Sequence, residues 1–193
     1  NTKEHPSQTW EAPSFEGIKL SEIQHLNGIS LRRNGHGLRF IQFFGMEVKV
    51  YVAGFYSQKP LLTENDVMTC RDTPMVLDFT FLRSVSKKRV TTAWQKQMEY
   101  SSSHRYEGFE ADSTAFSEML ASSIESGGKQ TVQIVGDDTI VIDQGAQKGR
   151  IRGRDFQKAF LSMFFGERAV TEELKSGLLN GDAFRVEEQC VGV

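Results

Sequence analysis

Arg39 and Tyr51 stand at equal distances from Gly45, one before it and one after it, in the segment GLRFIQFFGMEVKVYVAGFY. A guanidinium group presents a planar fork of donors that matches a carboxylate, and a phenol adds one further donor of similar reach. If the two side chains meet, they can clamp an anion. The same two residues can equally form an ordinary cross-strand cation–π or hydrogen-bonded pair that needs no ligand.

Whether these side chains meet depends on how segment 37–56 folds. One continuous strand would separate Arg39 from Tyr51 by about 40 Å, at roughly 3.3 Å per residue. A reversal at Gly45 would instead place them opposite each other on adjacent strands, with Cβ atoms about 5 Å apart. We expect the reversal, because glycine adopts the positive φ of a tight turn and the segment is too long for an ordinary single strand.

The expected hairpin has two dissimilar faces. The face predicted to pack on a core holds the even-numbered residues, which are mostly apolar: Leu38, Phe40, Phe44, Met46, Val48, Val50 and Val52, interrupted by Gln42. The odd-numbered face is expected to pair as follows, from the turn inward: Phe43 with Glu47, Ile41 with Lys49, Arg39 with Tyr51, then Ala53 and Phe55. This order predicts the wall of a cleft whose mouth is polar and solvated.

Periodicity predicts the remaining elements. Short strands are expected at 17–20 and 29–33, with a turn at Asn34–Gly37 before the hairpin, and further strands at 75–83, 131–135, 139–142 and 149–152. Helices are expected from Ser86 to about Ser101, from Asp112 to about Ser126, before Gly166, and after Thr171. Strands first and helices later predict an α+β protein, with helices on one side of an antiparallel sheet.

Composition predicts one globular domain. The chain has 193 residues, of which 38% are hydrophobic and 25% are charged, enough to bury a core. We expect residues 1–14 to form a flexible N-terminal arm and residues 15–193 to form the single domain. The net charge of −2 and the short apolar runs predict a soluble protein with no nucleic-acid partner and no stable membrane insertion.

No motif for a metal, a cofactor or a catalytic triad is evident, and we expect no cofactor. Cys70 and Cys190 are too few for a disulfide scaffold or a zinc site, and the four histidines lack ligand spacing. His104, beside three serines, indicates a polar helix end, since triads are assembled in space. One dense cationic cluster is either a solvated strand edge or a docking surface for an acidic partner such as an acyl carrier protein: Lys148, Arg150, Arg152 and Arg154.

Three motifs, in the same order and with the same elements between them, resemble the chalcone isomerase family, including its non-enzymatic fatty-acid-binding branch. They are KVYVAGFY at 49–56, FLRSVS at 81–86, and FGERAVT at 165–171 followed by LK at 174–175 and GLL at 177–179. The resemblance extends from about residue 28 to residue 181. It implies an open-faced β-sandwich, in which helices lie on a large antiparallel sheet and a ligand cleft separates the two.

The resemblance also implies roles for residues. Arg39 falls on the family's cleft arginine, and an adjacent tyrosine at Tyr51 is the pairing with which the fatty-acid-binding members hold a carboxylate. This chain departs from true isomerases at four positions: Tyr51 for threonine, Val90 for tyrosine, Gln97 for asparagine and Met163 for threonine. Two polar groups have become apolar, and losing one orienting donor costs about 100-fold or more in rate. Efficient isomerase activity is therefore not expected.

We accordingly expect a non-catalytic protein of fatty-acid metabolism that binds a long-chain fatty acid, with Arg39 and Tyr51 on the carboxylate. The acyl tail is expected to lie in an apolar pocket formed by Ala53, Phe55, Val90, Trp94, Gln97, Phe160 and Met163. Two alternatives stay open: an isomerase of a chalcone or related enone that uses Arg39 as electrophile, and a ligand-free module that binds another enzyme through 148–154. The resemblance implies the plastid stroma for a plant or algal protein and the cell envelope for a bacterial one.

Overall fold

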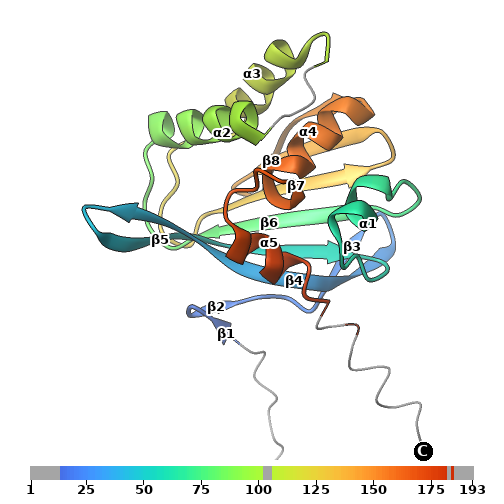
Figure 1. Ribbon diagram of the computed structural model, residues 1–193, viewed down its shortest axis with the longest axis horizontal. Coiled ribbons are helices and arrows are strands. Elements are labelled where there is room, and N and C mark those ends of the chain that lie inside the picture. Colours follow the sequence, from blue (N-terminus) through green and yellow to red (C-terminus); the bar gives the residue numbers. More distant parts are fainter. Residues whose placement is uncertain (1–13, 102–105, 182–183, 185–193) are drawn as a thin grey trace, which may run out of the picture.

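The computed structural model describes residues 14–101, 106–181 and 184, and a single large antiparallel sheet forms its centre (Figure 1). The sheet's seven strands lie side by side in chain order: β3 (Ile23–Leu26), β4 (Ile29–Phe43), β5 (Met46–Ser57), β6 (Met75–Phe81), β7 (Lys129–Val135), β8 (Asp138–Asp143) and β9 (Ala146–Arg152). A separate small ribbon consists of β1 (Ser14–Phe15) and β2 (Ile18–Lys19). The expected α+β class and large antiparallel sheet are confirmed.

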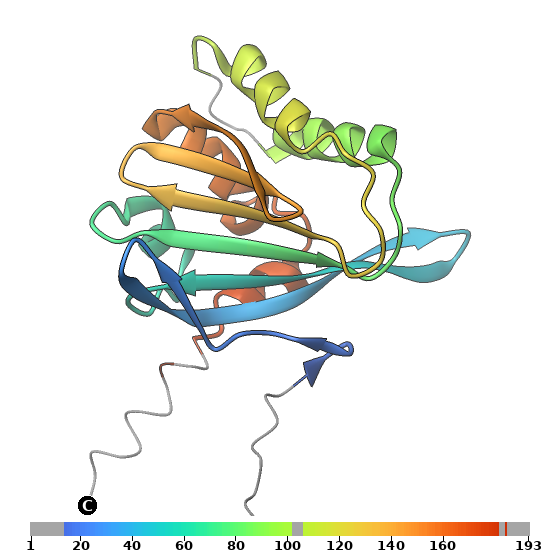
Figure 2. The same ribbon diagram turned by 180° about the vertical axis from the view of Figure 1, so that it is seen from behind.

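Helices gather on one side of this sheet, as the opposite views of Figures 1 and 2 show. They are α1 (Glu64–Thr69), α2 (Lys87–Ser101), α3 (Phe109–Met119), α4 (Arg154–Phe165) and α5 (Glu172–Leu178). The segment that holds α2 and α3 connects β6 to β7, which are neighbours in the sheet. Both helices therefore belong to a long connection between two adjacent strands of the sheet.

Aromatic rings dominate the core between the sheet and the helices. Trp94 of α2 meets Phe79 of β6 edge-on at 5.3 Å between ring centroids, and Phe116 of α3 at 5.5 Å. Its indole Nε1 donates to Gln130 Oε1 at 3.1 Å. Edge-to-face packing adds to the stabilisation that burial gives, and the hydrogen bond satisfies the one polar atom of the ring. Trp94 is consequently fixed between the sheet and α3.

Asn34–Gly37 belong to β4 and do not form the expected turn. Helix α5 lies directly on this part of the strand: a Cβ at Gly35 would come 2.2 Å from the carbonyl oxygen of Gly177, and a Cβ at Gly177 would come 2.4 Å from that of His36. The glycines are thus required by a close approach of two backbones, a use of glycine that sequence alone does not distinguish from turn formation.

Other boundaries also differ from expectation. The strand expected at 29–33 is the first part of β4, and β3 was not expected. The helix expected to run to about Ser126 ends at Met119, and Ile124 instead forms a β-bridge with Val85. After this helix end the chain runs next to the sheet, where the hydroxyl of Ser122 donates to Asp143 Oδ2 at 2.6 Å.

Some expectations lie outside the described residues. These are the N-terminal arm, except for Ser14 at the start of β1, and also Cys190 and His104. Cys70 is buried and free. No helix of the described residues is long and apolar enough to cross a membrane, and no group of three potential metal ligands occurs among them.

Candidate functional site

The β4–β5 hairpin carries one wall of the candidate site. The chain reverses at Phe44 and Gly45, whose φ angles are 48° and 75°, so the turn has the two positive-φ residues of a tight hairpin. The pairing of β5 with β6 begins at Tyr51, opposite Phe81. The outer part of the hairpin therefore projects beyond the sheet as a two-stranded ribbon (Figures 1 and 2).

A β-bulge next to Tyr51 determines which side chains share a face of this ribbon. Arg39 lies opposite Tyr51, as expected, but the register then shifts by one residue, so that Phe40 lies opposite Lys49. Farther out, Ile41 pairs with Val48, Gln42 with Glu47 and Phe43 with Met46. The expected pairs Ile41 with Lys49 and Phe43 with Glu47 are wrong, because the bulge turns the outer part of β5 over relative to β4.

The bulge collects apolar side chains on the face that looks toward α2. Ile41, Phe43 and Val48 lie on this face, although they come from odd positions of one strand and an even position of the other. The reverse face carries Lys49, whose Nζ lies 2.6 Å from Glu16 Oε2 in the β1–β2 turn. The expected core face of even-numbered residues is wrong at the tip, where the sheet has ended and Phe44 is 88% exposed.

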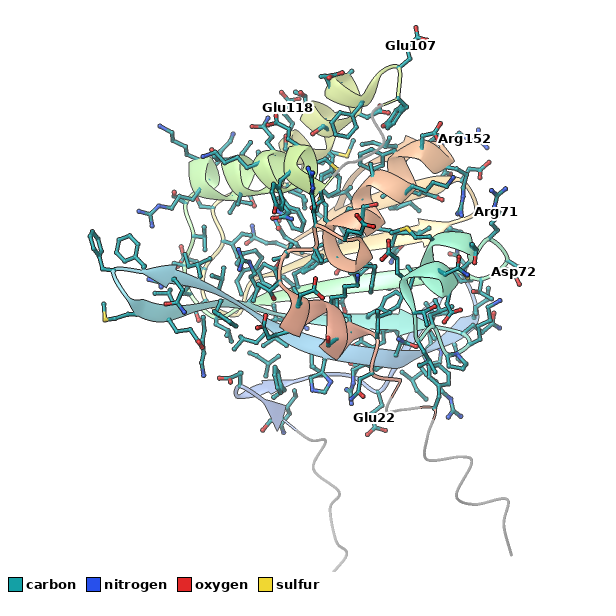
Figure 3. The ribbon with its side chains drawn as sticks, in the orientation of Figure 1. Glu22, Arg71, Asp72, Glu107, Glu118 and Arg152 are labelled. Carbon is teal, nitrogen blue, oxygen red and sulfur yellow. The ribbon has the colours of Figure 1, made fainter. Side chains whose placement is uncertain are left out.

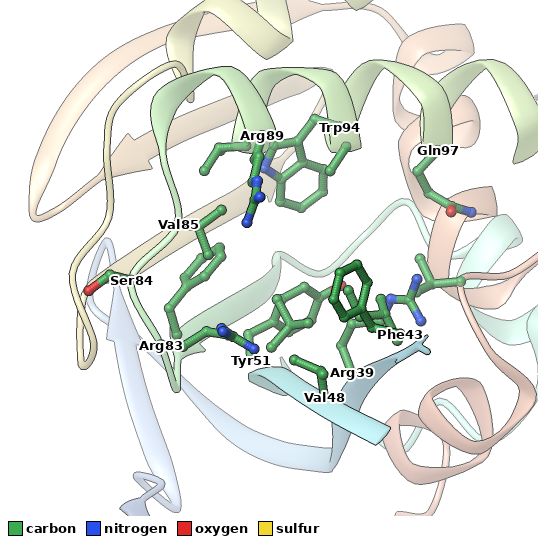
Figure 4. A pocket seen from close by; sticks show the side chains of 16 residues that line it. Arg39, Phe43, Val48, Tyr51, Arg83, Ser84, Val85, Arg89, Trp94 and Gln97 are labelled. Atoms are coloured by element: carbon green, nitrogen blue, oxygen red, sulfur yellow. The ribbon is translucent and has the colours of Figure 1, made fainter. Parts of the chain in front are cut away.

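A cavity of about 490 Å³ lies between the ribbon, the end of β6 and α2 (Figure 4). The hairpin lines it with Arg39, Ile41, Phe43, Val48, Val50 and Tyr51. The end of β6, α2 and the connection between them line it with Phe81, Arg83, Ser84, Val85, Arg89, Val90, Ala93, Trp94 and Gln97. Val170, between α4 and α5, completes the lining. This lining is mostly apolar, and it includes three arginines but no acidic side chain. Such a cavity favours an amphipathic anion.

Tyr51 forms the buried floor of the cavity. Its ring packs edge-on against Phe79 at 5.3 Å, and burial raises the pKa of its phenol far above the ordinary value, while the charge of Arg39 lowers the pKa by less. The phenol is therefore protonated at neutral pH and available as a donor. Among the described residues, none forms a hydrogen bond with its hydroxyl.

Arg39 stands beside this floor and is half-buried. One of its N–H groups donates to the carbonyl of Phe40, at the bulge. This bond anchors one arm of the guanidinium to the strand. A guanidinium carries five N–H donors, so further donors stay available to a ligand.

The polar groups of the cavity form two separate ends (Figure 4). Arg39 and Gln97 lie toward one end, and the Gln97 amide nitrogen donates to Ser101 Oγ at 2.7 Å. Arg83 and Arg89 lie toward the other end, where Arg89 points from α2 into the cavity. The apolar residues between these ends leave room for an aliphatic chain.

Of the expected pocket residues, Val90, Trp94 and Gln97 lie in the cavity wall together with Arg39 and Tyr51. The other four lie instead in the core, outside the wall: Ala53, Phe55, Phe160 and Met163. Their part of the interior is filled by aromatic packing, for example Phe160 against Phe116 at 5.4 Å.

Arg83 and Arg89 are site residues that the sequence did not single out. Arg83 was visible inside the FLRSVS motif, and Arg89 stands in a first helical turn without acidic residues. For Arg89 that absence is a signal, since acidic side chains are the ones favoured at a helix N-terminus.

The structure combines an antiparallel sheet, helices on one side of it, and an apolar, cation-bearing cavity beneath one helix, which defines an α+β protein with a preformed cavity. A sequence profile of the family described as chalcone isomerase-like matches residues 12–180. The chain belongs to the chalcone isomerase-like family, and the resemblance found in its motifs is confirmed.

Among solved structures, the fatty-acid binding protein AtFAP1 of Arabidopsis thaliana is similar to this chain. The two are 16% identical with a TM-score of 0.60, and the match covers 84% of this chain and 98% of that one. At this identity the likeness is one of fold. No curated protein matches the chain in sequence.

Proposed function

We propose that this protein binds a long-chain fatty acid without transforming it, and that Arg39 and Tyr51 hold the carboxylate. The observation that carries the proposal is the cavity itself, because an apolar wall contains a protonated phenol and arginines but no acidic side chain. Guanidinium and phenol donors together suit a carboxylate. The shared fold with a fatty-acid binding protein supports the same class of ligand.

In this proposal the acyl tail runs along the ribbon and α2. Ile41, Val48, Phe81, Val90 and Trp94 offer it apolar contact. Each buried methylene contributes about 0.8 kcal/mol before the cost of ordering the chain. Tail burial thus supplies most of the affinity, while the polar end fixes the direction of the ligand.

Replacing Arg39 tests the carboxylate site. Arg39→Ala is expected to weaken fatty-acid binding by roughly 2–4 kcal/mol, because a carboxylate in a largely apolar cavity loses its main partner. Arg39→Lys keeps the positive charge but loses the planar set of donors, so we expect its affinity for fatty acid to lie between those of the parent protein and Arg39→Ala. Displacement of a fluorescent fatty acid measures these affinities, and mass spectrometry of lipid extracted from the purified protein identifies the natural ligand.

Two further variants make this test specific. Arg71→Ala is the matched control, since Arg71 is exposed and points away from the molecule on the side opposite the ribbon (Figure 3), and it should bind like the parent protein. Arg89→Ala probes the other end of the cavity, where an exposed charge contributes at most about 1 kcal/mol. A larger loss for Arg89→Ala than for Arg39→Ala would reverse the proposed orientation of the ligand.

The same proposal predicts that no chalcone is cyclised. Tyr51, Val90 and Gln97, three of the positions that differ from isomerases, line the cavity, and Val90 offers no polar group there. Mixing a chalcone with the protein should leave the decay of the chalcone absorbance at its uncatalysed rate. Rapid bleaching that Arg39→Ala abolishes would instead establish the isomerase alternative.

The cellular setting follows from the family resemblance alone. For a plant or algal source, we place the protein in the plastid stroma, in fatty-acid metabolism. Two of the four cations in the acidic-partner surface expected at 148–154 have an opposite charge beside them, because Arg150 and Arg152 lie 3.2 and 3.7 Å from Asp138. The guanidinium of Arg154 is held by a hydrogen bond to Gln157 at 2.7 Å. These contacts favour the solvated strand edge over a docking surface for an acyl carrier protein.

A further inference from the structure

The tip of the β4–β5 ribbon exposes a cluster of large apolar side chains. Phe43, Phe44 and Met46 are 56%, 88% and 63% exposed, and the rings of the two phenylalanines meet edge-on at 4.6 Å. The other exposed large apolar residues of the described chain, apart from the adjacent Ile41, are scattered singly: Ile23, Leu62 and Tyr100. A contiguous apolar cluster on a protruding tip indicates an interaction site.

The backbone at this tip gives a second observation. Phe44 has a φ of 48°, in the left-handed region that a bulky residue rarely occupies. Glycine or asparagine at this turn position would satisfy the same geometry without a large side chain. The fold itself gains nothing from Phe44, because its side chain is almost entirely in solvent. Its size and apolarity therefore point to a contact outside this chain.

Four cations lie in the connection from β6 to α2 and in the first turn of α2, and two of them, Arg83 and Arg89, line the cavity together with residues of the ribbon. Arg83, Lys87, Lys88 and Arg89 are all exposed, and none forms an ion pair with another described residue. Nearby acidic groups include Glu47 on the ribbon, Glu16, which pairs with Lys49 on the reverse face, and Glu125, which accepts a hydrogen bond from Ser84. Since the whole chain has a net charge of −2, this cationic end is a local feature.

The mouth of the cavity opens at this same end. The exposed members of its lining include Ile41 and Phe43 from the ribbon and Arg83 and Arg89 from the segment that faces it, whereas Tyr51 lies buried at its floor. The apolar tip, the cations at the start of α2 and the exposed part of the cavity lining therefore belong to the same end of the molecule, where the ribbon projects below α2 (Figure 1).

We propose that this end of the protein docks reversibly on the surface of an anionic lipid bilayer. Phe43, Phe44 and Met46 enter the interface between head groups and acyl chains, and Arg83, Lys87, Lys88 and Arg89 contact the anionic head groups. A narrow convex tip suits penetration of a fluid layer better than contact with a flat protein surface. Docking brings the cavity mouth to the bilayer, so that an apolar ligand passes between the two without crossing water.

Co-sedimentation with vesicles tests this proposal. We expect the protein to sediment with vesicles of phosphatidylcholine and phosphatidylglycerol, and more weakly with phosphatidylcholine alone, because the cations add an electrostatic attraction. The double variant Phe44→Ser, Met46→Ser should lose about ten-fold or more in vesicle affinity, since it removes apolar surface that the bilayer buries. Neither residue lines the cavity, and both are exposed, so the fold does not depend on them.

Two more variants separate the contributions. Lys87→Glu, Lys88→Glu should reduce binding to anionic vesicles to the level seen with neutral ones. Ile23→Ser is the matched control, because Ile23 is 48% exposed but lies on β3, on the other side of the molecule from the tip (Figure 1). This control should sediment like the parent protein.

Three results would overturn the proposal: no sedimentation with anionic vesicles, equal sedimentation of the Phe44, Met46 double variant, or a dimer in analytical ultracentrifugation that this double variant abolishes. The last result would assign the tip to a second copy of the chain. Two further measurements distinguish a failure of the proposed fatty-acid binding from a failure of the proposed membrane docking. In vesicle-free buffer the double variant should bind fatty acid like the parent, and Arg39→Ala should still dock on vesicles.

Discussion

At the scale of single residues, two buried phenols of β5 contribute to the response of this protein to alkaline pH. Tyr51 and Tyr56 lie on opposite faces of β5, one over the cavity floor and the other in a smaller apolar cluster with Leu31 and Val76. Burial, followed by the nearby charge of Asp78, raises the pKa of Tyr56 to about 12, and burial raises that of Tyr51 as well. In the folded state both phenols hold their protons more tightly than in the unfolded chain.

This shift predicts alkaline destabilisation. An unfolded tyrosine has a pKa of about 10, so the stabilisation is complete below about pH 10 and is lost as the pH rises toward the folded values. The free energy of unfolding from urea titrations should be constant near neutral pH and then fall. Tyr56→Phe removes one of the two groups and should make the alkaline fall shallower. An unchanged slope in this variant would show that Tyr56 is not the group responsible.

At the scale of elements, the seating of α5 on β4 is the most demanding contact in the fold. Gly35→Ala would drive a methyl group against the backbone oxygens of Gly177 and Leu178, at 2.2 and 2.5 Å, which cannot rotate away. We expect a loss of about 3 kcal/mol or more in unfolding free energy, at the upper end of overpacking effects. Gln42→Ala, an exposed change in the same strand, should stay within about 0.5 kcal/mol. Equal stability of the two variants would mean that α5 shifts to make room.

The elements also mark the limit of prediction from sequence. The strand β6 and the helices α2, α4 and α5 follow their apolar periodicity, because each buries one continuous stripe. The prediction that Arg39 lies opposite Tyr51 is confirmed, but the single turn at Gly45 from which it was made does not by itself produce this pairing. A turn over Phe44 and Gly45 alone would pair Arg39 with Val50, and only the bulge brings Tyr51 opposite. A bulge depends on how the ribbon leaves the sheet, which local sequence does not encode.

At the scale of the whole molecule, motif order was sufficient for the fold but not for the extent of the cavity. Met163 was expected at the ligand because it falls where the isomerases have threonine, and Phe160 because it lies on the same apolar side of the helix. Neighbouring rings such as Phe116 and Phe164 fill that space instead. Whether the cavity lies on one side of Trp94 or the other depends on how β6, α3 and α4 pack around this ring together. The cationic rim of the cavity escaped prediction for a related reason, since exposed arginines at a helix start usually face solvent alone.

The connection that carries α2 and α3 begins after Phe81 of β6 and returns to the same residue, just before β7. Phe81 N donates to Gly128 O at 2.9 Å, and Gly127 N donates to Phe81 O at 2.7 Å, so the chain closes a loop there. The side of the cavity opposite Tyr51 is therefore formed by an insertion between β6 and β7 whose two ends are hydrogen-bonded to each other, whereas Tyr51 itself belongs to a strand of the sheet. A change in the length or sequence of that insertion is expected to alter the volume next to the Tyr51 hydroxyl without altering the pairing of β5 with its neighbouring strands. We therefore expect substitutions in α2 and α3 to change the size of the cavity while β5, which carries Tyr51, stays paired in the sheet.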